Sequence, residues 1–255
     1  MLSPSQILTS NNCGQCANKD ELGFDFTMAF QPIIDWHGKR IFGYEALCRG
    51  PSNESAFWVI SQVNDKNRYV FDQQCRVKAI ALAAQLNLKS MLSINFLPNA
   101  VYNPQRCIRT TLEAAKQYHF PTENIMFEFT EVEKIDDAEH VKKVVEYYHA
   151  LGFQTAIDDF GAGYSGLGLL ANFQTDIIKL DMGLIRDINT DKSRQIIVKN
   201  TLNMLQELGI KALVEGIETV GEMQWLAQAG CSLMQGYLFA KPGFESLPEV
   251  DFSRF

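Results

Sequence analysis

From Phe24 onward, short apolar runs alternate with longer amphipathic stretches, and this alternation limits the possible folds more than any other feature. The short runs are apolar on both faces, which is typical of parallel strands buried between two layers. The longer stretches have the periodicity of helices. The pattern predicts strands at residues 26–34, 41–47, 91–97, 125–130, 153–158, 176–181, 211–216 and 233–238, and helices at 54–64, 67–87, 104–118, 137–150, 166–172, 193–208 and 220–229.

Eight strands, most of them followed by a helix, predict an α/β fold, a TIM (β/α)8 barrel. Only the segment Asp35-Trp36-His37-Gly38 separates the first two strands. A link that short can join antiparallel neighbours but cannot make a parallel crossover. We therefore expect a modified barrel with one antiparallel strand. Residues 1–22 are polar and lack periodicity, so they are expected to form an N-terminal tail, and residues 23–255 to form the barrel domain.

The composition excludes several classes of function. The net charge is −7, and no basic stripe is visible of the kind that proteins binding long nucleic acids carry. No apolar run approaches the roughly 18–20 residues of a membrane span. The N-terminus lacks a basic patch followed by an apolar stretch, so we expect no signal peptide and a cytoplasmic location. An acidic protein can still bind a small phosphate ligand if metal ions supply the positive charge.

The six cysteines are expected to be reduced thiols rather than a disulfide framework. Cys13 and Cys16 form the only CxxC pair, and no second pair completes a zinc site. The simplest interpretation is two free thiols in the tail. A redox pair, or half of a metal site shared between subunits, remains the alternative.

Polar residues stand at or near one end of every predicted strand after the first. In a barrel of parallel strands the carboxyl ends meet at one mouth, where active sites of this fold are built. Five carboxylates at one mouth would repel one another unless cations lay between them. Oxygen ligands favour Mg²⁺ or Mn²⁺ over zinc. In chain order these residues are Glu45, Asn95, Glu128, Asp158, Asp159, Lys179, Glu215 and Gln235.

Taken together, the motifs resemble the EAL family of cyclic-di-GMP phosphodiesterases. The signature triplet is Glu45-Ala46-Leu47 within FGYEALCRG, and FQPIID precedes it. The other motifs follow in the family's order over about residues 24–243: SINFLPNA, FEFTE, IDDFGAGYSGL, IIKLD, LVEGIET and QGYLFAKP. A single triplet occurs by chance in many proteins, but eight motifs in order are strong evidence.

The resemblance implies a role for each of these residues. It implies two divalent cations, Mg²⁺ or Mn²⁺, with cyclic di-GMP as the substrate and linear pGpG as the product. The first cation would be bound by Glu45, Asn95, Glu128 and Asp158, and the second by Asp158, Asp159 and Glu215. Lys179, Glu215 and Gln235 would act in catalysis, Gln31, Leu47 and Arg49 would contact the substrate, and Glu131 would support the loop after Asp159.

Two other functions remain open at this point. The chain could be a receptor that binds cyclic di-GMP without turnover, or a scaffold that contacts a regulator. An intact ligand set argues for the enzyme, because a receptor has no use for two catalytic metals. The resemblance also suggests a homodimer.

Overall fold

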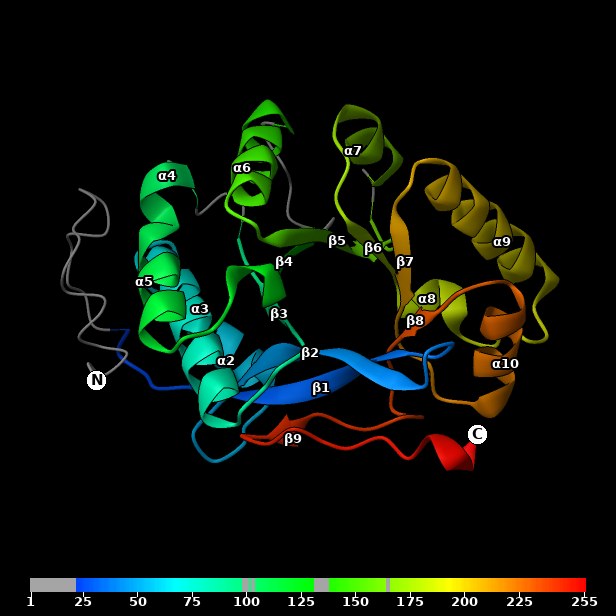
Figure 1. Ribbon diagram of the computed structural model, residues 1–255, viewed down its shortest axis with the longest axis horizontal. Helices are drawn as coiled ribbons and strands as arrows, with labels where there is room; N and C mark the ends of the chain where they lie inside the picture. The colour runs from blue at the N-terminus through cyan, green and yellow to red at the C-terminus, as the bar shows by residue number, and fades with distance from the viewer. Residues whose placement is uncertain (1–21, 98–100, 102–103, 131–137, 164–165) are drawn as a thin grey trace.

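The structure is a computed structural model that describes residues 22–97, 101, 104–130, 138–163 and 166–255. These residues form one sheet of nine strands in the order β2-β3-β4-β5-β6-β7-β8-β1-β9, and a further pairing of β2 with β1 closes it into a barrel (Figure 1). The predicted modified TIM barrel is therefore confirmed. The strands are β1 (Thr27–Asp35), β2 (Arg40–Arg49), β3 (Met91–Asn95), β4 (Ile125–Thr130), β5 (Gln154–Phe160), β6 (Ile177–Leu180), β7 (Lys211–Val214), β8 (Leu233–Met234) and β9 (Gly243–Phe244).

Strand β1 is the reversed strand. It pairs antiparallel with both of its barrel neighbours, β2 and β8, whereas β2 to β8 pair in parallel from one strand to the next. The reversal follows from the short turn after Asp35. The Oδ1 of Asp35 stabilises this turn by accepting a hydrogen bond from Gly38 N at 3.1 Å. Lys39 completes the turn with a φ of 49°.

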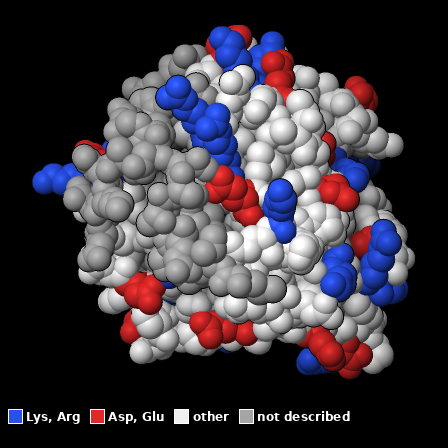
Figure 2. All heavy atoms as spheres, turned by 60° about the vertical axis from the view of Figure 1, so that its left-hand side comes forward, with Lys and Arg blue, Asp and Glu red and all other residues white. Residues whose placement is uncertain are grey.

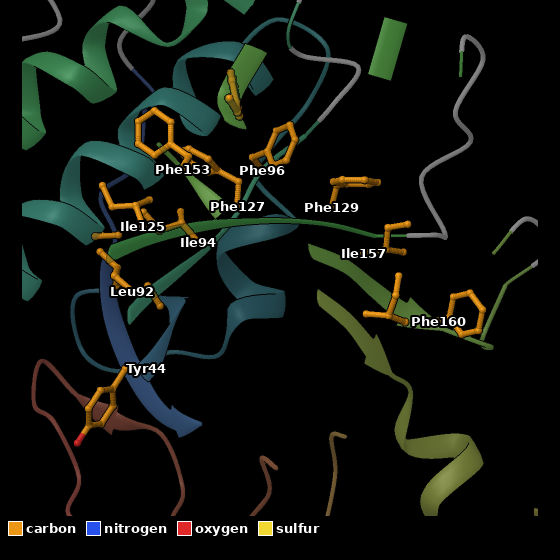
Figure 3. Packing of buried hydrophobic residues seen from close by; sticks show 14 of the residues in the cluster. Tyr44, Leu92, Ile94, Phe96, Ile125, Phe127, Phe129, Phe153, Ile157 and Phe160 are labelled. Carbon is orange, nitrogen blue, oxygen red and sulfur yellow. The ribbon is translucent and has the colours of Figure 1, made fainter. Parts of the chain in front are cut away.

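The helices lie around the outside of the barrel (Figure 1). They bury their apolar faces against the strands, and Figure 3 shows part of this layer, in which Phe96, Phe127 and Phe153 come together beside β4. None of the described helices is both long and apolar enough to cross a membrane. The helices are α2 (Ala56–Ile60), α3 (Arg68–Gln85), α4 (Pro104–Cys107), α5 (Arg109–Gln117), α6 (Ala138–Ala150), α7 (Gly166–Asn172), α8 (Met182–Ile185), α9 (Lys192–Glu207) and α10 (Val220–Gln228).

A second, smaller apolar cluster fills the inside of the barrel. Because seven different strands contribute to it, its members must point inward. Four of them, Met91, Met126, Ile177 and Leu233, are the first or second residue of a parallel strand, so the cluster fills that end of the barrel. The members are Ile33, Met91, Met126, Ala156, Ile177, Leu213 and Leu233.

Several predicted boundaries were wrong. The last strand was expected to continue to residue 238 but ends at Met234. The predicted helix at 104–118 is two helices, α4 and α5, and the one at 54–64 is only Ala56–Ile60. The short elements α8 and β9, and two turns of 3-10 helix at Thr122–Asn124 and Phe252–Arg254, were not predicted. The expected tail, apart from Leu22, lies outside the described residues.

The charge on the face seen in Figure 2 is mixed, with acidic and basic side chains interspersed among the described residues. The thiols of Cys48, Cys75, Cys107 and Cys231 are free, as expected. Cys13 and Cys16 lie outside the described residues, so their role stays a prediction.

Candidate active site

The polar residues of the site form the next inward layer above the apolar cluster. Side chains two residues apart on a strand point to the same face. On β4, β5 and β6, the residues two positions after a member of the apolar cluster are Glu128, Asp158 and Lys179. The residues two positions after the cluster members of β7 and β8 are Glu215 and Gln235. The alternation of the strands therefore brings these five side chains to one level of the barrel.

The pair Asp158-Asp159 departs from this alternation. Successive residues of a regular strand point to opposite faces. The pairing of β5 with β6 shifts register between Ile157 and Phe160, which is the mark of a β-bulge. Asp159 also has a φ of 55°, a left-handed conformation that is rare for a non-glycine residue. The bulge turns Asp159 toward the same mouth as Asp158, and both line one cleft there.

Lys179 lies at the centre of the carboxylates and has no exposed surface. Its Nζ donates a hydrogen bond to Glu128 Oε2 at 2.7 Å. It lies 2.8 Å from Glu215 Oε1, 3.1 Å from Asp158 Oδ1 and 3.7 Å from Glu45 Oε2. A buried ammonium requires such partners, because burying an unpaired charge is costly.

Two amide side chains complete the cluster. Asn95 Nδ2 donates to Glu45 Oε1 at 3.0 Å, and Gln235 Nε2 donates to Glu45 Oε2 at 2.8 Å. Both oxygens of Glu45 are therefore held by amides, one from the last residue of β3 and one from the residue directly after β8. This arrangement fixes the orientation of a carboxylate that is itself 6% exposed.

Burial and crowding change the acid–base behaviour of the cluster. Burial raises the pKa of Glu128 to about 8, with Glu45 and Asp158 adding to the shift and Lys179 opposing it. Burial also raises the pKa of Asp159 to about 6, helped by the neighbouring Asp158. The pKa of Glu215 is raised well above its usual value, again chiefly by burial. Burial by itself would lower the pKa of Lys179, but the surrounding carboxylates raise it well above normal.

The donor set fits divalent cations. Two groups of three carboxylates have oxygens that all lie within 4.8 Å of one another: Glu45, Glu128 and Asp158 form one, and Asp158, Asp159 and Glu215 form the other. Asp158 belongs to both. Glu128 Oε1 and Gln235 Oε1 are buried without a hydrogen-bond partner in the described part of the chain. Such oxygens suit a hard cation such as Mg²⁺ or Mn²⁺.

The carboxylates open into a cleft of about 340 Å³ at the barrel mouth. Gln31 lines it, and its Nε2 donates to Ala240 O at 3.3 Å. Sequence reasoning missed six residues of the wall: Asp181, Met182, Gly216, Glu218, Gly236 and Tyr237. Tyr237 was placed inside the last predicted strand, but β8 ends at Met234, so the ring reaches the rim with 56% of its surface exposed. The position of Asp181 next to β6 was the one available signal for that residue.

Two other predicted residues lie elsewhere. Leu47 lines a separate, mostly apolar hollow of about 260 Å³, which it shares with Asn95. Arg49 donates through Nη1 to Cys48 O at 2.7 Å and does not line the acidic cleft. Glu131 lies outside the described residues.

Comparison with known proteins identifies the family. The family model described as the EAL domain matches residues 20–242. The chain belongs to the EAL domain family. Among curated relatives, it is 33% identical over 223 residues to the blue light- and temperature-regulated antirepressor BluF of Escherichia coli, covering 87% of this chain and 55% of that protein. It is 31% identical over 238 residues to the cyclic di-GMP phosphodiesterase RocR of Pseudomonas aeruginosa, covering 89% and 59%.

Solved structures of EAL proteins match in three dimensions as well. A standalone versatile EAL protein from Vibrio cholerae, solved in its c-di-GMP bound form, is 67% identical with a TM-score of 0.89, covering 91% of this chain and 99% of that one. A manganese and cyclic-di-GMP complex of Klebsiella pneumoniae BlrP1 is 36% identical with a TM-score of 0.83, covering 88% and 58%. The EAL chain spans little more than half the length of the curated relatives named above.

Proposed function

We propose that this chain hydrolyses cyclic di-GMP to linear pGpG with two divalent cations, Mg²⁺ or Mn²⁺. The observation that carries the proposal is the pair of carboxylate groups that share Asp158, with Lys179 among them. The named activity of RocR and the cyclic di-GMP in the Vibrio cholerae and BlrP1 structures support the substrate. The manganese in the BlrP1 complex supports the cation.

The residues divide into two cation sites. Glu45, Asn95, Glu128 and Asp158 would hold the first cation, and Asp158 with Asp159 and Glu215 would hold the second. When bound, the cations would polarise one phosphodiester and activate a water molecule for attack on phosphorus.

Lys179 would stabilise the charge that develops during attack. Once cations neutralise the carboxylates around it, its ammonium can donate to the attacking water and to a phosphoryl oxygen. These bonds strengthen as negative charge builds on the phosphoryl group. Lys179→Ala should therefore lower kcat by about 100-fold or more, by analogy with the loss of a preorganised donor, and weaken substrate binding much less.

Glu215 and Gln235 would act on the water molecule. Glu215 lines the cleft and belongs to the second group of carboxylates, so it would lie within reach of the water as a general base. Gln235 donates through its amide nitrogen to Glu45, which leaves its oxygen to accept a hydrogen bond from the water. Gln31, which lines the cleft, would contact the substrate. The predicted substrate contacts of Leu47 and Arg49 stay a prediction, because neither residue lines the cleft.

The proposal is tested by incubating the protein with cyclic di-GMP and each cation in turn, and resolving the products by chromatography. The wild type should release pGpG, and Glu45→Gln should be at least about 100-fold slower, because a catalytic metal supplies several kcal/mol. Glu207→Gln, an exposed carboxylate at the end of α9, serves as the matched control and should be unchanged. Full turnover by Glu45→Gln at saturating metal would refute the site.

A binding protein is the second candidate, because one relative in the family is named an antirepressor. Binding of cyclic di-GMP by the wild type without any turnover in Mg²⁺ or Mn²⁺ would favour a receptor. Neither binding nor turnover would favour a scaffold.

A further inference from the structure

The short segment that begins with Asn95 is fixed at three consecutive residues. Asn95 Nδ2 donates to Glu45 at 3.0 Å, and Phe96 N donates to Glu128 O at 2.9 Å. Leu97 N donates to Asp72 Oδ1 at 3.0 Å. The first two partners belong to the barrel, whereas the third belongs to helix α3 on the outside.

Asp72 is part of a buried ion pair. It is 3% exposed, and its partner Arg76, one turn later in α3, is 1% exposed. Arg76 Nη2 donates to Asp72 Oδ2. The other end of the guanidinium reaches the next helices, since Nη1 donates to Cys107 O at 3.5 Å and to Thr111 Oγ1 at 3.4 Å. The pair therefore ties α3, α4 and α5 to the backbone that follows Asn95.

Aromatic packing fixes the middle residue of the segment. The Phe96 ring contacts Phe127, Phe129 and Tyr148 with centroid distances of 5.7, 5.8 and 5.9 Å (Figure 3 labels the three phenylalanines). Phe96 also lines the apolar hollow of about 260 Å³, together with Asp72 and Asn95. Leu97 also lines that hollow, so the segment has room to shift if its bond to Asp72 is lost.

A buried ion pair often contributes little net stability compared with apolar residues in the same place. Replacing such a pair with apolar residues of similar size is often neutral or stabilising. An apolar residue at position 72 could not, however, accept the hydrogen bond from Leu97 N. That bond is the specific contribution of Asp72.

We propose that Asp72, held in place by Arg76, is a positioning residue that sets the cation affinity of the site by fixing the backbone two residues after Asn95. This inference rests on the proposed function, in which Asn95 is a metal ligand. Residues that orient a metal ligand without contacting the metal typically contribute about 10–100-fold to metal affinity. Asp72 touches neither substrate nor cation.

Two double variants isolate the hydrogen bond. Asp72→Asn/Arg76→Met removes both charges but keeps an oxygen that can accept from Leu97 N. Asp72→Leu/Arg76→Met has nearly the same shape and lacks that oxygen. Calorimetric titration with Mn²⁺ in the absence of substrate gives the cation affinity, and thermal unfolding of the same samples gives stability.

We expect the asparagine variant to bind Mn²⁺ within about threefold of wild type, and the leucine variant about 10-fold or more weakly. The leucine variant should also need more Mn²⁺ for half-maximal turnover while its kcat at saturating Mn²⁺ recovers. Asp35→Leu is the control for a general loss of stability. The Asp35 carboxylate accepts hydrogen bonds from Ser232 Oγ and Gly38 N at the opposite end of the barrel. Its loss should therefore lower Tm and leave Mn²⁺ affinity unchanged.

Equal Mn²⁺ affinity in the two double variants would overturn the inference, even if both hydrolyse cyclic di-GMP. A wild type that neither binds Mn²⁺ nor hydrolyses cyclic di-GMP would overturn the proposed function and the inference with it. If the leucine variant does not fold, Asp72→Ala/Arg76→Met replaces it with the same expectation, because alanine also lacks the acceptor.

Discussion

Substitution of Lys179 by methionine should destabilise the metal-free protein far more than the metal-loaded protein. The side chain has no exposed surface, and its ammonium lies within 2.7–3.7 Å of four carboxylates. Methionine keeps the length of the side chain and removes the charge. The four carboxylates then lose the cation that balances them, unless metal ions supply one.

The size of the effect follows from the burial. Removing one partner of a buried ion pair costs about 3–5 kcal/mol, since the other charge is left uncompensated. A chain of this length loses about 2–4 °C in Tm for each kcal/mol. We therefore expect Lys179→Met to lower Tm by about 6–20 °C in the metal-free protein. The loss should be smaller near pH 6 than near pH 9, because carboxylates that bind protons repel one another less.

Thermal unfolding followed by circular dichroism gives the Tm of the metal-free protein in EDTA and of the metal-loaded protein in excess Mn²⁺. Lys211→Met, at the exposed start of β7, is the matched control and should change Tm little in either condition. A loss of Tm that is the same with and without Mn²⁺ would refute the reasoning. So would an unchanged Tm in EDTA at pH 9, because Lys179 would then not be the cation that balances the cluster.

Three further predictions concern pH, backbone and thiols. The Tm of the metal-free wild type should fall as pH rises from about 5 to 9. Burial raises the pKa of Glu128 from 4.5 to about 8, so the stability it contributes is present below the unfolded-state pKa and is lost as pH rises through the folded-state pKa. Excess Mn²⁺ should suppress this dependence. Gly161→Ala should cost about 1–3 kcal/mol in urea unfolding, because φ is 99° and a Cβ would lie 2.5 Å from a leucine methyl, whereas Gly168→Ala, which meets nothing within 4 Å, should not. A Cys13→Ser/Cys16→Ser variant should match wild-type turnover under reducing and oxidising conditions, and a redox response that disappears in the variant would contradict the free-thiol interpretation.

The sequence predicted the barrel because apolar periodicity and link length are local properties. The short turn after Asp35 was sufficient to predict one reversed strand. No local signal predicted where β8 ends. The chain leaves the strand after Met234, and a Cβ on Gly236 would clash with Ile217 O, a close approach that only the folded backbone reveals. The four-residue α8 and two-residue β9 are too short to show a period.

The convergence of the site was predictable for a similar reason. Strand ends in a parallel barrel meet at one mouth, so polar residues at those ends had to approach one another. The bulge that turns Asp159 toward the mouth was not predictable, because it depends on the register between β5 and β6. The anchoring of Leu97 by Asp72 was hidden as well, since it joins positions 25 residues apart through a backbone amide.

The reversal of β1 also decides where the chain enters the barrel. In a barrel whose first strand is parallel to the rest, the polypeptide arrives at the end opposite the catalytic mouth. Here Thr27 pairs with Arg49, beyond Glu45 in the direction of the mouth. The chain therefore enters β1 from the catalytic side. A change in the chain at the start of β1 would therefore act at the catalytic end directly, without a signal having to cross the barrel.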